Sequence, residues 1–174
     1  MLITISGLPG SGTSTLSKLV AAALGIEHVD GGTVFRSLAA ERGVSVAEFS
    51  AIAERDASID VDLDARLAER ARAGEVVLES RLAGWIATNE GLAATRIWVA
   101  CADDERARRV AAREGVAVTD AGTANEVRER SERERYAAYY GIDFEDLSIY
   151  DLRLDSGRAT PEELAATVLD WVRG

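Results

Sequence analysis

The segment Gly7-Leu8-Pro9-Gly10-Ser11-Gly12-Thr13-Ser14 decides which fold this chain can adopt. It follows an apolar run, Leu2–Ile5, and precedes an amphipathic run over residues 15–24. A strand, a glycine-rich loop and a helix in this order build a phosphate-binding loop, with the pattern Gly, four residues, Gly, Lys, and Ser or Thr. The two outer glycines and Ser14 fit this pattern, but Thr13 occupies the position of the lysine.

Backbone groups supply most of the binding in such a loop. Glycines permit the positive-φ turns that point N–H groups at a phosphate, and the N-terminus of the following helix adds free donors and partial positive charge. The sequence therefore predicts that residues 7–14 and Thr15 hold nucleotide phosphates and that the Ser14 hydroxyl holds Mg²⁺. Because the lysine is missing, an ordinary glycine-rich turn remains the alternative.

Composition limits the class of protein. The 174 residues, 47% hydrophobic, suit a single domain over residues 1–174. We expect a cytoplasmic protein, because the chain has no apolar run long enough for a membrane span and no leader pattern. The net charge of −10 disfavours nucleic-acid and membrane partners. The acidic excess and the single lysine, Lys18, suggest a high-salt habitat as a hypothesis, and the lone Cys101 is expected to be a small core residue.

Strand and helix patterns alternate, which predicts an α/β fold: a three-layer sandwich with a central five-stranded parallel sheet. We expect strands at residues 2–6, 26–30, 75–79, 96–100 and 152–155. Three helices between residues 33 and 73, the first capped by Thr33, exceed one crossover and predict a helical flap inserted at about residues 31–73. A turn is expected at residues 120–123, followed by an arginine-rich helix to residue 140. Ligands should bind beyond the carboxyl ends of the strands.

Ordered arginines are the second signal. On a helix, Arg128, Glu132 and Arg135 share one face, so two guanidinium groups could grip a polyphosphate while Glu132 holds them in place. The alternative is a solvated helix with local ion pairs. Two further pairs, Arg109 with Arg113 and Arg36 with Arg81, could reach phosphates or lie on the surface. The only histidine, His28, is expected to be a packed strand residue.

These residues resemble nucleoside monophosphate kinases, most closely the archaeal type of cytidylate kinase. The matching segments are 3–14, 32–36 (GTVFR), 78–85 (LESRLAGW), 128–136 (RERSERERY), 140–143 (YGID) and 146–151 (DLSIYD). In cytidylate kinases the lid carries an arginine followed by an acid, then two residues, a second acid, two residues and a second arginine. Arg128-Glu129, Glu132 and Arg135 match this pattern. The resemblance implies a P-loop kinase core, a helical flap that binds the nucleoside monophosphate and an arginine-rich lid at about residues 114–140.

The resemblance also implies roles for single residues. ATP phosphates would bind the glycine loop and Arg109, with Arg113 beside them at the base of the lid. Arg128 and Arg135 would act on the transferring phosphoryl group. The acceptor would bind at Gly32, Arg36 and Arg81. In the flap, Asp60, Asp64 and Arg66 are polar candidates for contacts with the acceptor, or plain surface residues. Ser14 and Glu79 would lie near Mg²⁺.

The resulting prediction is an ATP-dependent kinase of CMP, with dCMP as a further acceptor, acting as a monomer. One alternative is the same mechanism with AMP, UMP or another small acceptor. Another is a nucleotide-binding regulatory protein without turnover.

Overall fold

A computed structural model describes the backbone of residues 1–174 and all side chains except those of Val46, Ala47 and Ser50. The elements in chain order are β1 (Leu2–Gly7), α1 (Thr13–Leu24), β2 (Glu27–Asp30), α2 (Gly31–Glu41), α3 (Val46–Ala53), α4 (Ala57–Ala73), β3 (Val76–Glu79), α5 (Ala83–Asn89), β4 (Thr95–Ala100), α6 (Asp103–Glu114), α7 (Val118–Tyr140), β5 (Leu152–Asp155) and α8 (Pro161–Arg173). The strands form one sheet in the order β2-β3-β1-β4-β5.

The sheet is parallel throughout and β1 lies at its centre. Leu2 of β1 is opposite Val76 of β3, and Ile3 is opposite Thr95 of β4. All residues of β1 are buried, as expected for a parallel strand covered on both faces. Since parallel strands end at the same edge, the glycine loop after β1 lies beside the ends of β2, β3 and β4.

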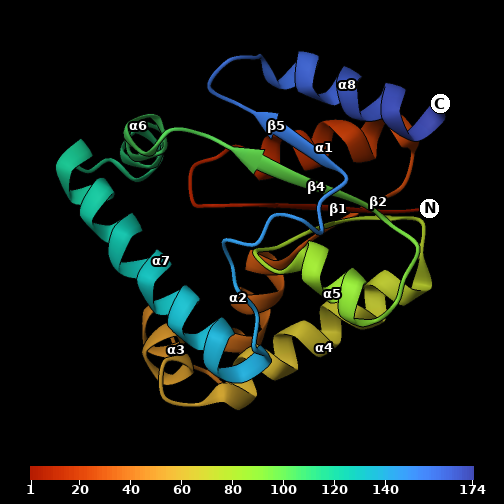
Figure 1. The fold of residues 1–174 in the computed structure, drawn as a ribbon. Coiled ribbons are helices and arrows are strands. Elements are labelled where there is room, and N and C mark those ends of the chain that lie inside the picture. The colour runs from red at the N-terminus through yellow and green to blue at the C-terminus, as the bar shows by residue number, and fades with distance from the viewer.

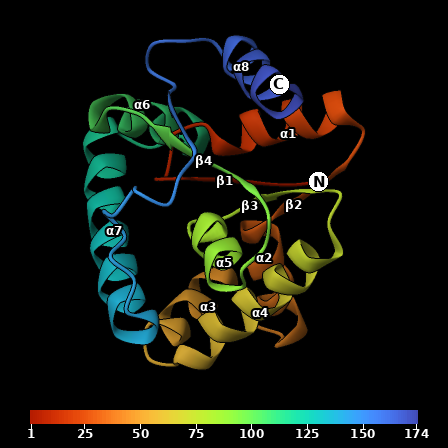
Figure 2. The same cartoon turned by 45° about the vertical axis from the view of Figure 1, so that its right-hand side comes forward.

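Helices cover both faces of the sheet, which confirms the predicted three-layer architecture (Figure 1). On one face, α1 and α8 bury Leu16, Val20 and Val168 against the strands. On the other face, α4, α5 and the segment after α7 bury Trp98 and a larger apolar cluster. Turning the molecule shows that α7 runs along one side, from α6 at one end to α3 and α4 at the other (Figure 2).

Helix ends depart from the sequence predictions at two places. Asp30, not Thr33, caps α2: its carboxylate accepts hydrogen bonds from the backbone N–H groups of Gly32 and Thr33. The turn predicted at residues 120–123 is wrong, because α7 already begins at Val118. Ala121 is buried against α6, and this packing draws the residues into the helix.

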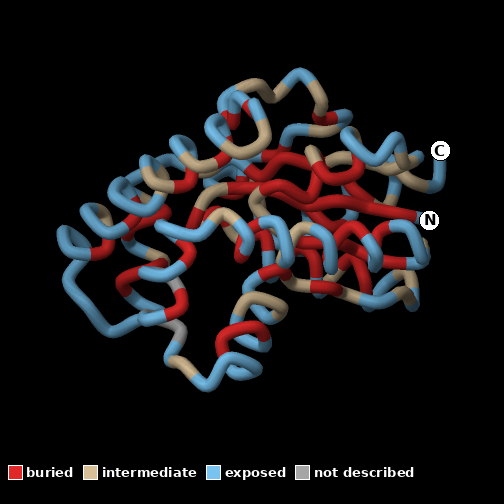
Figure 3. The backbone as a smooth tube through the Cα atoms, turned by 90° about the horizontal axis from the view of Figure 1, so that it is seen from below, coloured by how far each residue is buried: buried red, intermediate tan, exposed pale blue. Residues whose placement is uncertain are grey.

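Two further features were not predicted correctly. Helix α5 was not expected from the sequence. It places Gly84 so close to Tyr150 that an added Cβ would lie 2.5 Å from the ring. Cys101 is partly exposed and not a core residue. Burial along the backbone is concentrated in the strands and in the helix faces that turn toward them (Figure 3). Across the described backbone, no helix combines the length and apolarity needed to cross a membrane.

Candidate active site

A cavity of about 1240 Å³ opens at the carboxyl edge of the sheet. Its walls come from the glycine loop, α2, α4, the end of β3 and α7. It brings together most of the residues that the sequence predicted for the site: Gly7, Leu8, Pro9, Gly10, Thr13, Ser14, Gly32, Arg36, Asp60, Glu79, Arg81, Arg113, Arg128 and Arg135. Four predicted residues do not line it: Ser11, Gly12, Thr15 and Arg109.

The glycine loop has the backbone that its sequence requires. Gly10 and Gly12 adopt φ values of 81° and 92°, which side chains rarely tolerate. A Cβ on Gly7 would lie 2.5 Å from Ser11 Oγ and 2.7 Å from the Val99 carbonyl oxygen. The loop therefore leads directly from a central strand into the N-terminus of α1, the arrangement that binds phosphate through backbone donors.

Thr13, at the position of the missing lysine, turns toward a carboxylate. Its Oγ1 donates to Glu79 Oε1 at 2.8 Å, and Ser14 Oγ donates to the same oxygen at 2.5 Å. His28 Nε2 lies 2.8 Å from the other oxygen, Glu79 Oε2. Glu79 is only 5% exposed, so these three side chains fix its carboxylate at the cavity wall.

His28 and Lys18 line the cavity although the sequence did not predict them as site residues. His28 is a packed residue of strand β2, as expected, and its ring also reaches Glu79. It lies opposite Val77 in the β2–β3 register, with Asp30 opposite Glu79, a pairing that sequence alone did not establish. Lys18 follows Ser14 by four residues and so lies on the same face of α1. This spacing could have predicted Lys18 as a site residue.

Three arginines surround the glycine loop. Arg81 Nη1 donates to the Gly7 carbonyl oxygen at 2.7 Å, and Arg106 Nη1 donates to the Pro9 carbonyl oxygen at 3.1 Å. Arg109 lies beside Gly12 and donates to the side chain and carbonyl oxygen of Ser156 at 2.9 and 2.8 Å. The loop therefore has guanidinium groups at its start, middle and end, although it lacks its lysine.

Two of these arginines, Arg106 and Arg109, are tied into the structure around the loop. Arg106 is 3% exposed and also binds Glu129 of α7 at 2.6 Å, which links the loop to the arginine-rich helix. Ser156 Oγ donates to the Ser11 carbonyl oxygen at 2.7 Å. Arg109 thus supports the loop from outside the cavity through Ser156.

The two arginines on the predicted face of α7 bind different carboxylates, Arg128 that of Glu132 and Arg135 that of Asp60. Glu132, 4% exposed, accepts from Arg81 Nε at 3.0 Å and from Arg128 Nε at 2.8 Å. Burial alone would raise the pKa of Glu132, but the two guanidinium groups outweigh it and lower the pKa. Arg135 instead donates to Asp60 of α4 at 2.9 Å, so Glu132 holds one of the two arginines expected beside it.

The remaining predicted arginines are also paired. Arg36 lies 3.3 Å from Asp30 and donates to Thr33 Oγ1 at 2.6 Å. Arg113 is exposed and pairs with Glu114. Each arginine predicted for the site therefore has a carboxylate neighbour, and an incoming phosphate would compete with these carboxylates or join them.

The donor set suits a hard cation that shares its ligands with a nucleotide. Among the side chains that the structure describes, no group of three His, Cys, Asp or Glu residues could hold a metal ion. Ser14 and Glu79 offer oxygen atoms only, and both line the cavity. Mg²⁺ commonly takes one or two protein oxygens and completes its shell with water and phosphate, so these residues fit it.

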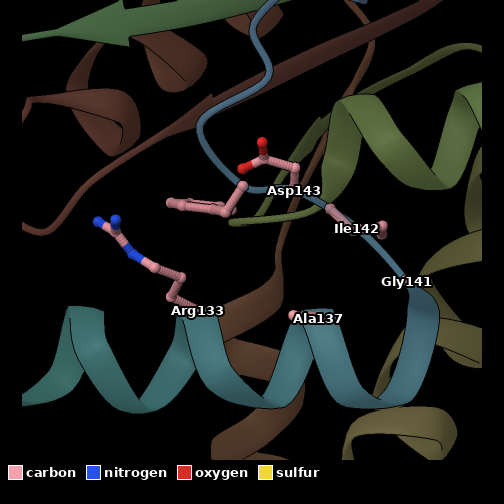
Figure 4. A pocket seen from close by; sticks show the side chains of 6 residues that line it. Arg133, Ala137, Gly141, Ile142 and Asp143 are labelled. Carbon is pink, nitrogen blue, oxygen red and sulfur yellow. The ribbon is translucent and has the colours of Figure 1, made fainter.

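A second, smaller hollow of about 280 Å³ lies at the C-terminal end of α7. It is lined by Arg133, Ala137, Gly141, Ile142, Asp143 and Phe144 (Figure 4). None of these was predicted as a site residue, and Arg133 is paired with Glu145. The predicted site residues that line a cavity therefore all line the larger one.

Comparisons with known proteins agree with this geometry. The model of the cytidylate kinase-like family matches residues 2–158. The chain is 48% identical to a cytidylate kinase of Halobacterium salinarum over 173 residues, covering 99% of this chain and 89% of that protein. It is 46% identical to a cytidylate kinase of Pyrococcus horikoshii over 168 residues, covering 97% and 86%.

Solved structures share the fold at low identity. An uncharacterized protein from Eubacterium ventriosum superposes with a TM-score of 0.76 at 17% identity, covering 100% of this chain and 99% of that one. A shikimate kinase from Bacteroides thetaiotaomicron gives a TM-score of 0.70 at 14% identity, with the same coverage.

Proposed function

Because the chain belongs to the cytidylate kinase-like family, we propose that it transfers the γ-phosphoryl group of ATP to CMP, with dCMP as a further acceptor. The observation that carries this proposal is the single cavity that joins the glycine loop to arginines of α2, of the segment after β3 and of α7. A site of this kind can hold a donor and an acceptor phosphate side by side among guanidinium groups.

We assign the two nucleotides to opposite parts of the cavity. The backbone from Gly7 to Thr15 takes the ATP phosphates, and Arg109 supports this loop through Ser156. Gly32, Arg36, Asp60 and Arg81 take the acceptor. Arg81 contacts the loop carbonyl of Gly7 at 2.7 Å, so it lies where the two phosphates would meet.

Three arginines serve the transfer itself: Arg113, Arg128 and Arg135. The acceptor phosphate already carries an anionic oxygen, which attacks the γ-phosphorus while the bond to the leaving ADP oxygen breaks. No strong general base is needed. Catalysis of this step depends on alignment and on positive charge around the transferring group. The guanidinium groups supply that charge once the phosphates displace their carboxylate partners.

The Mg²⁺ that accompanies ATP would be held by Ser14 directly and by Glu79. When bound, the ion neutralises charge on the β- and γ-phosphates. Thr13 and His28 hold the Glu79 carboxylate in place for this role.

We further propose that residues 31–73 form a flap and residues 114–140 a lid that close over the bound nucleotides. The ion pairs Arg135–Asp60 and Arg81–Glu132 already connect α7 to α4 and to the segment after β3. Closure would exclude water, which otherwise accepts the phosphoryl group of ATP.

An acceptor panel tests the proposed function. ADP formation from Mg²⁺-ATP is measured with CMP, dCMP, UMP and AMP in turn. CMP should give the highest kcat/KM. Faster reaction with AMP or UMP would reject CMP as the preferred acceptor. ATP binding without ADP formation for any acceptor would favour a regulatory nucleotide-binding protein.

A further inference from the structure

One positive side chain of the large cavity differs from all the others. The lysine and arginine side chains that line the cavity are Lys18, Arg36, Arg81, Arg113, Arg128 and Arg135. Each of the arginines lies in an ion pair with a carboxylate. Lys18 is exposed to the cavity and forms no ion pair with a described side chain. Its ammonium group is therefore free to bind an anion without first releasing a carboxylate.

The place of Lys18 on α1 directs its side chain toward the glycine loop. It follows Ser14 by four residues, so the two side chains lie one above the other on the same face of the helix. Side chains of an α-helix point back toward its N-terminus. The four-carbon stem of Lys18 can span one turn, which brings the ammonium group beside Ser14, at the end of the helix where the ATP phosphates would bind.

Thr13 shows why a cation is needed there. This residue occupies the position at which a phosphate-binding loop carries its lysine, and it brings no charge. Its hydroxyl donates to Glu79 Oε1 at 2.8 Å, so that donor is already used within the protein. The backbone N–H groups of the loop remain available to phosphate, but no residue of the loop itself supplies an ammonium group.

We propose that the Lys18 ammonium group binds the non-bridging oxygens of the β- and γ-phosphates of ATP. It would thus supply, from the second turn of α1, the charge that the loop lacks at position 13. The assignment to the donor follows from Ser14, which shares the helix face of Lys18 and would hold the Mg²⁺ of ATP. The acceptor phosphate is instead met by Arg36 and Arg81, which come from other elements. This assignment rests on the proposed function and adds a residue that contacts the donor.

The variant Lys18→Met tests the proposal by calorimetry with Mg²⁺-ATP and, separately, with CMP. Methionine keeps an unbranched stem and favours helix, so an exposed position on α1 should accept it. The Kd for ATP should rise by about tenfold or more, because a hydrogen bond to a charged group is lost. The Kd for CMP should not change. Lys18→Arg should keep part of the ATP affinity, since the positive charge remains on a long stem.

Arg173→Met is the matched control for the loss of one positive charge from a chain of net charge −10. Arg173 is exposed at the end of α8, does not line the cavity and forms no ion pair with a described side chain. The control should keep the ATP affinity of the parent. An unchanged ATP affinity in Lys18→Met would overturn the proposal. An equal loss of CMP affinity would also overturn it, because Lys18 would then not select the donor.

Nuclear magnetic resonance tests the same contact in the unaltered protein. Because Lys18 is the only lysine, labelling with ¹⁵N-lysine gives a single side-chain ammonium signal. Its protons should exchange with water more slowly when Mg²⁺-ATP is bound, since phosphate oxygens accept them, and CMP alone should not slow them. Unchanged exchange at saturating ATP would overturn the proposal while leaving CMP phosphorylation intact. Failure of the parent to phosphorylate CMP would instead refute the proposed function.

Discussion

Replacing Glu132 by glutamine should destabilise the nucleotide-free protein and increase its response to ligand. The Glu132 carboxylate is 4% exposed and binds Arg81 and Arg128. Glutamine keeps the shape of the side chain but removes the charge that both guanidinium groups face. The Arg81 guanidinium, 19% exposed, would then lie beside Gly7 without a carboxylate.

The expected magnitude follows from the burial of the partners. Removing one member of a buried ion pair costs about 3–5 kcal/mol. Arg128 is 61% exposed, so water screens its share, and the lower figure of about 3 kcal/mol applies. For a domain of this size, each kcal/mol changes Tm by about 2–4 °C, which gives a decrease of about 6–12 °C.

Thermal unfolding followed by circular dichroism, with and without CMP and an ATP analogue, measures both effects. The phosphates should replace the lost carboxylate, so the ligand-induced rise in Tm should be larger in Glu132→Gln than in the parent. Glu134→Gln is the control, because Glu134 is exposed on the same helix and forms no ion pair with a described side chain. A Tm decrease below about 2 °C in Glu132→Gln would refute the ion-pair argument.

The pH dependence of this effect has a defined sign. Arg81 and Arg128 lower the pKa of Glu132 in the folded protein against the opposing effect of burial. The stability that the carboxylate contributes is therefore present above its unfolded pKa, about 4.3, and is lost as the pH falls through the lower folded value. The Tm difference between parent and Glu132→Gln should be full at pH 7 and should shrink below pH 4.

Three other variants test separate parts of the site. Arg135→Ala should lower kcat by a factor of about 10³, since an arginine at the transferring phosphoryl group can contribute that much. A steady-state kcat within tenfold of the parent would show that Arg135 does not act on the transferring group. His28→Ala should raise the Mg²⁺ concentration needed for half-maximal nucleotide binding by about tenfold, because Glu79 loses an orienting contact. His28→Asn should recover part of this loss. If calorimetry finds the same Mg²⁺ dependence in the parent and in His28→Ala, the proposed role of His28 is wrong. Gly10→Ala should lower both Tm and ATP affinity, because φ of Gly10 is 81° and an added Cβ would lie 2.6 Å from the Arg106 carbonyl oxygen. Normal ATP binding by the variant would show that the loop does not need glycine at this position.

Local patterns were sufficient to predict the architecture. The order of strand, glycine loop and helix identified the centre of the sheet, and apolar runs located all five strands within about two residues. Helix α5 and the start of α7 were missed because tertiary contacts decide them. Gly84 packs against Tyr150, which lies far along the chain, and Ala121 is drawn into α7 by α6.

The sequence predicted the composition of the site better than its internal pairing. Spacing on α7 placed Arg128 beside Glu132, and the structure confirms that contact. It could not show that Arg81 reaches the same carboxylate or that Arg135 turns to Asp60, because those contacts join residues 51 and 75 positions apart. His28 was missed for the same reason: its role depends on the register between β2 and β3.

Thr13 removes the amine that a nucleotide-binding loop of this type normally carries, and Lys18 is the only lysine in the chain. Lys18 lines the cavity, is exposed and forms no ion pair with a described side chain. The N-terminal ammonium group is bound to Glu75 on the opposite edge of the sheet. Amine-reactive dyes have only two groups to modify, Lys18 and the N-terminal ammonium, and a dye on Lys18 would provide a fluorescent reporter beside the bound nucleotides.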